Sequence, residues 1–125
     1  MDTPMRIPAD SGFRSLWLQN MVGRELMTHV RQRTRDELPP DLSTEAREAA
    51  LRAIDDALYS LTMLVDGIFA PTRDETGRIQ FQVDLVGRLQ DVETGEVLHA
   101  ESLHDGDGAC GWMAGWLEGD FGEHS

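Results

Sequence analysis

A cluster of side chains that can bind a metal or move a proton lies near the C-terminus: His99, Glu101, His104, Asp105, Asp107 and Cys110. Imidazole, carboxylate and thiolate groups are the usual ligands of transition metals. A calcium loop of the EF-hand type is excluded, because Ala109 and Trp116 stand where further oxygen ligands are needed. One hypothesis is therefore a transition-metal site whose ligands are His99, His104, Asp105, Asp107 and Cys110. The alternative, which we favour, is a solvated turn with incidental histidines.

Cys110 is the single cysteine of the chain, so it cannot form an intrachain disulfide. As a nucleophile it would need a base, and the candidates are His99, His104 and His29. A lone cysteine is more often a small buried hydrophobe, which is the interpretation we prefer. Glu25 and His29 have half the spacing of a zinc-protease helix motif, but the second histidine is missing. No residue is assigned a catalytic role.

Asp66 is an unusual carboxylate, because it stands at the predicted end of a helix, where the helix dipole disfavours an anion. Three interpretations are open, in decreasing order of preference. The carboxylate is exposed at the turn, it bonds an arginine such as Arg14 or Arg24, or it is a functional acid with a perturbed pKa.

The C-terminal segment combines aromatic, acidic and glycine residues. Trp112 and Trp116 are four residues apart and share a face if the segment is helical. Aromatic anchors dominate the energetics of protein interfaces, so one hypothesis is a partner-binding face. The alternative is that both tryptophans cover the open face of a sheet. The partner-binding set would be Trp112, Trp116, Phe121, Asp105, Asp107, Glu118 and Asp120.

The elements that must position these residues begin with two helices. Apolar residues four apart predict a first helix from residue 13 to about 36: Leu18, Val22, Leu26 and Val30. Three arginines fall on its opposite face, either as a solvated surface or as partners for the acidic remainder: Arg24, Arg31 and Arg35. Ser43 is the predicted cap of a second helix, which ends near Gly67. Its buried stripe is Ala50, Ile54, Leu58, Leu61 and Val65.

Alternating apolar residues then predict a half-buried strand: Ile79, Phe81, Val83 and Leu85. We expect a bulge near Gly87, a hairpin connection over residues 91–96 with positive φ at Gly95, and a returning strand over 97–103. A short helical turn is expected near 112–117. The predicted fold is α+β, with two N-terminal helices packed on a small antiparallel sheet and a Gly/Trp-rich C-terminal segment. We expect a single domain over 1–125, with residues 1–11 as a loosely ordered arm.

The chain of 125 residues carries a net charge of -12, and its basic residues are all arginine, which we interpret as the mark of a GC-rich bacterial gene. Residues 91–125 hold nine acids and no basic residue. This acidity argues against binding to nucleic acid or to an anionic membrane surface. A secretory signal pattern and an apolar run long enough to span a membrane are both missing, so we expect a soluble cytoplasmic protein.

Two classes of function follow. The first, which we favour, is a non-enzymatic protein-binding domain of the inhibitor or immunity type, whose acidic, aromatic C-terminal face meets a basic protein. The second is a metal-binding protein or small metal-dependent enzyme using the cluster between His99 and Cys110. Self-association through the C-terminal segment is a further alternative for the same surface.

Overall fold

The computed structural model describes residues 5–104 and 109–122. Its first helix begins where Asp10 accepts hydrogen bonds from the amides of Gly12 and Phe13, at 2.9 and 3.1 Å. It runs through α1 (Ser11–Glu25), a π-helical segment η1 (Leu26–Gln32) and α2 (Arg33–Asp36). The expected helix is therefore confirmed, but the π segment was not predicted. Its wider turn breaks the spacing of the apolar stripe, and Val30 is 45% exposed.

The second long helix, α3 (Thr44–Val65), has the boundaries that its sequence predicts. The Ser43 hydroxyl accepts a hydrogen bond from the Ala46 amide at 3.1 Å, which caps the helix. The chain leaves the helix through Gly67, whose φ of 71° suits glycine. α3 is tied to the first helix by Asp55, which accepts hydrogen bonds from Arg31 at 2.7 and 3.2 Å and from Arg35 at 3.4 Å. Arg31 and Arg35 therefore pair with Asp55 within the protein and do not form a solvated face.

The main sheet is an antiparallel pair, β3 (Val86–Gln90) and β4 (Val97–Ser102). The returning strand and the positive φ at Gly95, 77°, are confirmed. The bulge lies at Leu89/Gln90 and not at Gly87. Gly87 has another role: a Cβ there would lie 2.9 Å from Cγ2 of Val22 and 3.3 Å from the Leu18 carbonyl oxygen. The missing side chain lets α1 approach the sheet closely.

The predicted half-buried strand from Ile79 to Leu85 is wrong. Only β2 (Gln80–Phe81) is a strand there, and it pairs with β1 (Thr72–Arg73) as a separate small hairpin. Ile79 and Phe81 are 69% and 72% exposed. The alternation of apolar residues is present, but in the described part of the chain no helix or sheet lies behind Ile79 and Phe81 to bury them. Leu85, at the other end of the run, packs against the core.

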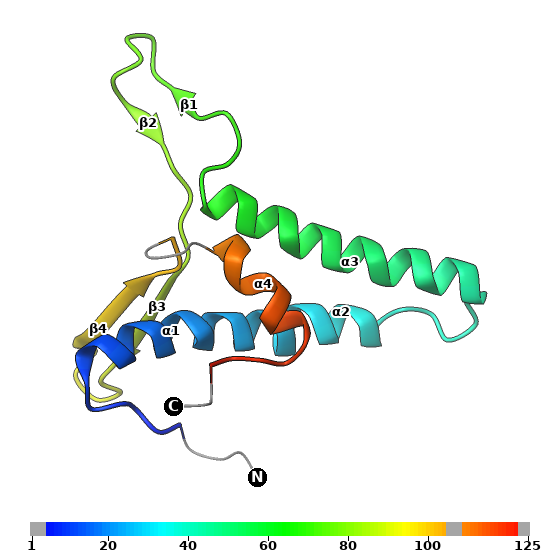
Figure 1. The fold of residues 1–125 in the computed structure, drawn as a ribbon, viewed down its shortest axis with the longest axis horizontal. Helices are drawn as coiled ribbons and strands as arrows, with labels where there is room; N and C mark the ends of the chain where they lie inside the picture. Colours follow the sequence, from blue (N-terminus) through cyan, green and yellow to red (C-terminus); the bar gives the residue numbers. More distant parts are fainter. Residues whose placement is uncertain (1–4, 105–108, 123–125) are drawn as a thin grey trace.

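Figure 1 shows α1 lying across the β3–β4 sheet, α3 running beside η1 and α2, and α4 (Ala109–Leu117) packed between α1 and α3. The α+β class is confirmed, although α3 packs chiefly on η1, α2 and α4 rather than on the sheet. None of the described helices has the length and apolar character needed to span a membrane. The buried core draws on both long helices, the end of β4 and α4: Met27, Leu58, Val65, Leu103, Ala109, Met113 and Trp116.

Candidate protein-binding surface

Trp116 lies in the core and not on a binding face. Its side chain is 1% exposed, and its indole Nε1 donates a hydrogen bond to Oδ1 of Asn20 at 3.0 Å. The ring packs on Gly23, where a Cβ would come within 2.2 Å of the ring carbon Cε2. The prediction that placed Trp116 among the partner-binding residues is therefore corrected, because the ring is enclosed between α4 and α1.

The other predicted anchors are partly covered as well. Trp112 is half-buried, and its indole Nε1 is fully buried without a hydrogen-bond partner in the described part of the chain. Phe121 is half-buried, with the guanidinium carbon of Arg24 5.7 Å from its ring centroid. Glu118 and Asp120 are exposed. Asp105 and Asp107 lie outside the described residues. The aromatic residues of this segment face the protein interior more than solvent.

Asp66 holds α4 onto the end of α3. Its carboxylate accepts hydrogen bonds from the backbone amides of Ala109 at 2.6 Å and Cys110 at 2.7 Å. Burial by itself raises the pKa of Asp66, but the hydrogen bonds from Cys110 and Ala109 outweigh it and lower the pKa below its usual value. The expected exposure at the turn and the expected bond to an arginine such as Arg14 or Arg24 are wrong. Asp66 is half-buried, Arg14 donates to the carbonyls of Pro8 and Ala9, and the guanidinium of Arg24 lies over the Phe121 ring.

Cys110 is half-buried, and its Sγ lies 3.5 Å from the hydroxyl of Thr62. Burial raises the pKa of the thiol, and the neighbouring Asp66 carboxylate raises it further. A raised pKa keeps sulfur in the protonated form, which is a poor nucleophile. Of the candidate bases, His29 pairs with Glu25 at 3.1 Å and His99 contacts α1. His104 is exposed and lies close enough to Asp66, the carboxylate that binds the Cys110 amide, to help lower the pKa of that carboxylate. The environment of Cys110 is that of a small core residue.

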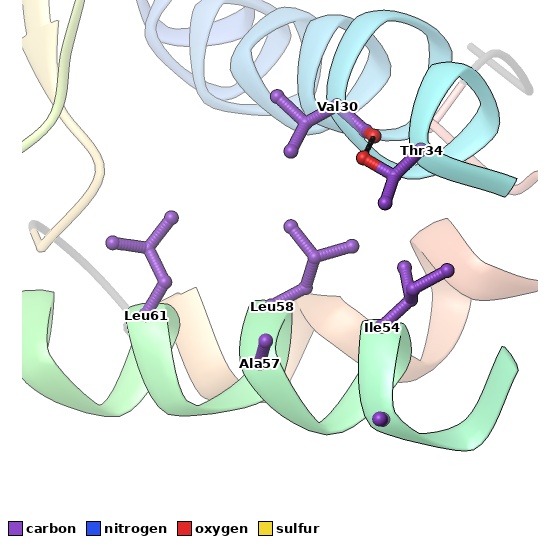
Figure 2. Close-up of a pocket in the computed structure, with 7 residues that line it drawn as sticks. Val30, Thr34, Ile54, Ala57, Leu58 and Leu61 are labelled. Atoms are coloured by element: carbon purple, nitrogen blue, oxygen red, sulfur yellow. Dashed lines mark hydrogen bonds between the residues drawn. The ribbon is translucent and has the colours of Figure 1, made fainter. Parts of the chain in front are cut away.

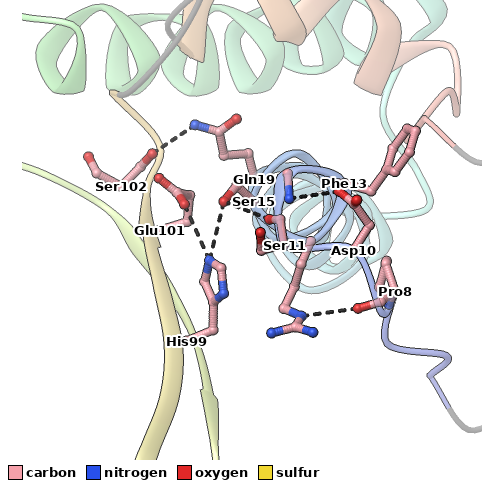
Figure 3. Close-up of polar contacts among 11 residues, drawn as sticks. Pro8, Asp10, Ser11, Phe13, Ser15, Gln19, His99, Glu101 and Ser102 are labelled. Atoms are coloured by element: carbon pink, nitrogen blue, oxygen red, sulfur yellow. Dashed lines mark hydrogen bonds and ion pairs between the residues drawn. The ribbon is translucent and has the colours of Figure 1, made fainter.

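His99 takes part in a contact that the sequence did not indicate. Figure 3 shows its ring between α1 and β4, with Nε2 lying 3.3 Å from Oγ of Ser15 and 3.4 Å from Oε1 of Glu101. A serine–histidine–acid relay needs the acid on the other ring nitrogen, whereas here both contacts fall on Nε2. The neighbouring Gln19 donates to the Ser102 carbonyl at 2.9 Å. This cluster joins α1 to the sheet and is not arranged as a catalytic triad.

The expected metal ligands are not brought together as far as the structure describes them. His99 faces α1, His104 is exposed, and Cys110 lies at the start of α4 beside Thr62. Among residues 5–104 and 109–122, no three histidine, cysteine or acidic side chains are placed to share one ion. The hypothesis then depends on Asp105 and Asp107, which lie outside these ranges.

An exposed apolar surface occurs instead on the small hairpin. Every residue from 67 to 82 is exposed, and Figure 1 shows the β1–β2 hairpin projecting away from the helices. We call residues 67–82 the hairpin arm. Large apolar side chains lie along it: Ile68, Phe69, Ile79 and Phe81, with exposures of 60%, 49%, 69% and 72%. A two-stranded hairpin of this size is marginal alone in water, and exposed apolar patches usually mark interaction sites.

A second apolar surface is a groove between η1–α2 and α3. Figure 2 shows Val30 and Thr34 above it and Ile54, Leu58 and Leu61 below, with α4 on the far side of the helix pair. The groove has a volume of about 410 Å³, and Ala53 and Ala57 complete its lining. Charged side chains are missing from this lining, so the groove suits an apolar surface and not an ionic ligand.

Comparisons with known proteins add no functional information. No family model matches the chain, and no curated protein or solved structure is significantly similar to it.

Proposed function

We propose that this protein is a non-enzymatic protein-binding domain that captures a basic partner through the hairpin arm. The observation that carries the proposal is the continuous exposure of the arm together with its large apolar side chains, above all Ile79 and Phe81. These residues replace the C-terminal tryptophans as the anchors, because Trp116 is buried in the core.

The charge of the chain supports a basic partner. With a net charge of -12, the protein attracts positively charged proteins over distances of about 10 Å and repels acidic ones. The arm itself is nearly neutral in charge, with Arg73 and Arg78 against Asp74 and Glu75. Long-range attraction would therefore bring the partner to the protein, and burial of the arm's apolar residues would hold it.

The expected strength of the anchors follows from their exposure. Full burial of a large apolar side chain contributes about 1.5–3 kcal/mol. Because Ile79 and Phe81 are already about 30% covered, covering the rest contributes roughly 1–2 kcal/mol each. Replacing both with serine should weaken binding roughly 30-fold or more.

The test compares which proteins are captured from a cell lysate by three immobilised forms of this protein. The forms are the wild type, Ile79→Ser/Phe81→Ser, and the control Val92→Ser/Leu98→Ser. The control changes two equally apolar side chains, 99% and 60% exposed, outside the arm. We expect a positively charged protein, identified by mass spectrometry, to be retained by the wild type and the control and lost from the arm variant. Equal retention by the arm variant, or a retained set without basic proteins, would contradict the proposal.

A further inference from the structure

We propose that the groove between η1–α2 and α3 is the contact of a symmetric dimer, in which α3 of a second copy lies antiparallel against α3 of the first. The lining of the groove shares no residue with the hairpin arm, so the inference does not rest on the proposed function. The groove and the adjoining side of α3 form one apolar face, which we call the α3 face.

The pattern of exposed residues on α3 is that of a helix–helix seam. Along the edge of the groove, which Ala53 and Ala57 help to line, residues spaced alternately four and three apart run along the helix: Ala46, Ala50, Ala53, Ala57, Ser60 and Leu64. All except the half-buried Ala50 are exposed. This is the spacing at which two helices interlock in a coiled coil. Small side chains here permit the close approach of a second helix.

Size complementarity selects an antiparallel copy. The side chain at the N-terminal end of the face, Ala46, is small, and the one at the C-terminal end, Leu64, is large and 42% exposed. A second α3 turned end over end about a point between Ala53 and Ala57 places each Leu64 beside the Ala46 of the other copy. In a symmetric pair this contact forms twice.

Charge complementarity selects the same arrangement. Arg52 and Asp56 are exposed on one edge of the face, on either side of its midpoint, and neither makes an ion pair in the described part of the chain. An antiparallel copy brings each Arg52 near the partner's Asp56. Residues 26–65 hold five arginines against seven acids, a net charge of -2, whereas residues 91–125 hold nine acids and no basic residue.

The test is the mass of the full chain in solution, measured by light scattering and sedimentation across a concentration series. We expect twice the chain mass of 14.0 kDa. Ala53→Glu/Ala57→Glu should be monomeric with unchanged helical circular dichroism, since glutamate is a good helix former. Ala114→Glu, an exposed alanine on α4, is the matched control and should stay dimeric.

Exchanging the charges of Arg52 and Asp56 tests the dimer without depending on how well the Ala53→Glu/Ala57→Glu variant folds. Arg52→Glu should weaken the dimer roughly two- to fivefold for each pair lost, and Arg52→Glu/Asp56→Arg should restore it. A wild type that is monomeric at millimolar concentration would overturn the inference. So would a dimer that persists in the folded alanine variant, or an exchange that fails to restore association. Ile79→Ser/Phe81→Ser should leave the dimer intact, which separates this result from the capture experiment.

Discussion

Gly23→Ala tests how α4 packs against α1. A Cβ at this position would lie 2.2 Å from Cε2 and 2.3 Å from Cδ2 of Trp116, far closer than carbon atoms can approach. The ring cannot swing away easily, because it is 1% exposed and its Nε1 bonds Asn20 at 3.0 Å.

Two opposing effects set the size of the change. Alanine in place of glycine inside a helix normally stabilises by about 1 kcal/mol. Forcing a methyl group into a filled core costs typically about 1–3 kcal/mol, and more when the neighbour is a fixed ring. We therefore expect Gly23→Ala to lower the free energy of unfolding by about 2 kcal/mol.

Gly115→Ala in α4 is the matched control, because its Cβ would meet only Asp120, at an ordinary 3.6 Å. This variant should be neutral or stabilised by up to about 1 kcal/mol. Urea unfolding followed by circular dichroism measures both midpoints, and an unchanged slope shows that the unfolded state is the same. A Gly23→Ala midpoint equal to or above that of the wild type would refute this packing of Trp116.

Two further predictions concern the contacts that join the helices. Asp66→Asn should lower the free energy of unfolding by about 1 kcal/mol by weakening the cap of α4. Because folding lowers the pKa of Asp66 below 3.8, this loss of stability should be complete above that pH and disappear as the pH falls through the lowered folded-state pKa. A loss of stability in urea unfolding that does not change with pH would contradict this cause. A double-mutant cycle between Arg31→Gln and Asp55→Asn should give a coupling of about 1 kcal/mol that weakens with salt, whereas the exposed Arg33→Gln should show no coupling to Asp55.

Local signals in the sequence were sufficient for much of the fold. Ser43 was predicted as a helix cap because its hydroxyl can reach the amide three residues ahead, and it does so. Gly67 and Gly95 were predicted at the helix end and in the hairpin turn, and both have positive φ. Such interactions span a few residues, so the residues that decide them are adjacent in the chain.

The features that depend on distant partners could not be predicted in the same way. Trp116 is enclosed because Gly23, far away in the chain, leaves room for its ring. Asp66 accepts hydrogen bonds from the first amides of α4, and no spacing of residues in the sequence indicates this contact. The alternation from Ile79 to Leu85 is typical of a half-buried strand, yet the fold leaves its first half without a surface to pack on. The exposed arm was missed for this reason.

The most direct test of the central claim is to identify what the hairpin arm touches in living cells. We would incorporate the photo-crosslinking residue p-benzoylphenylalanine at position 81 and, as a control, at position 92, which is 99% exposed in the β3–β4 turn. The proposed function predicts a covalent adduct between position 81 and a basic protein, and none with that protein from position 92. Adducts with copies of this chain alone, or no adduct from position 81, would contradict it.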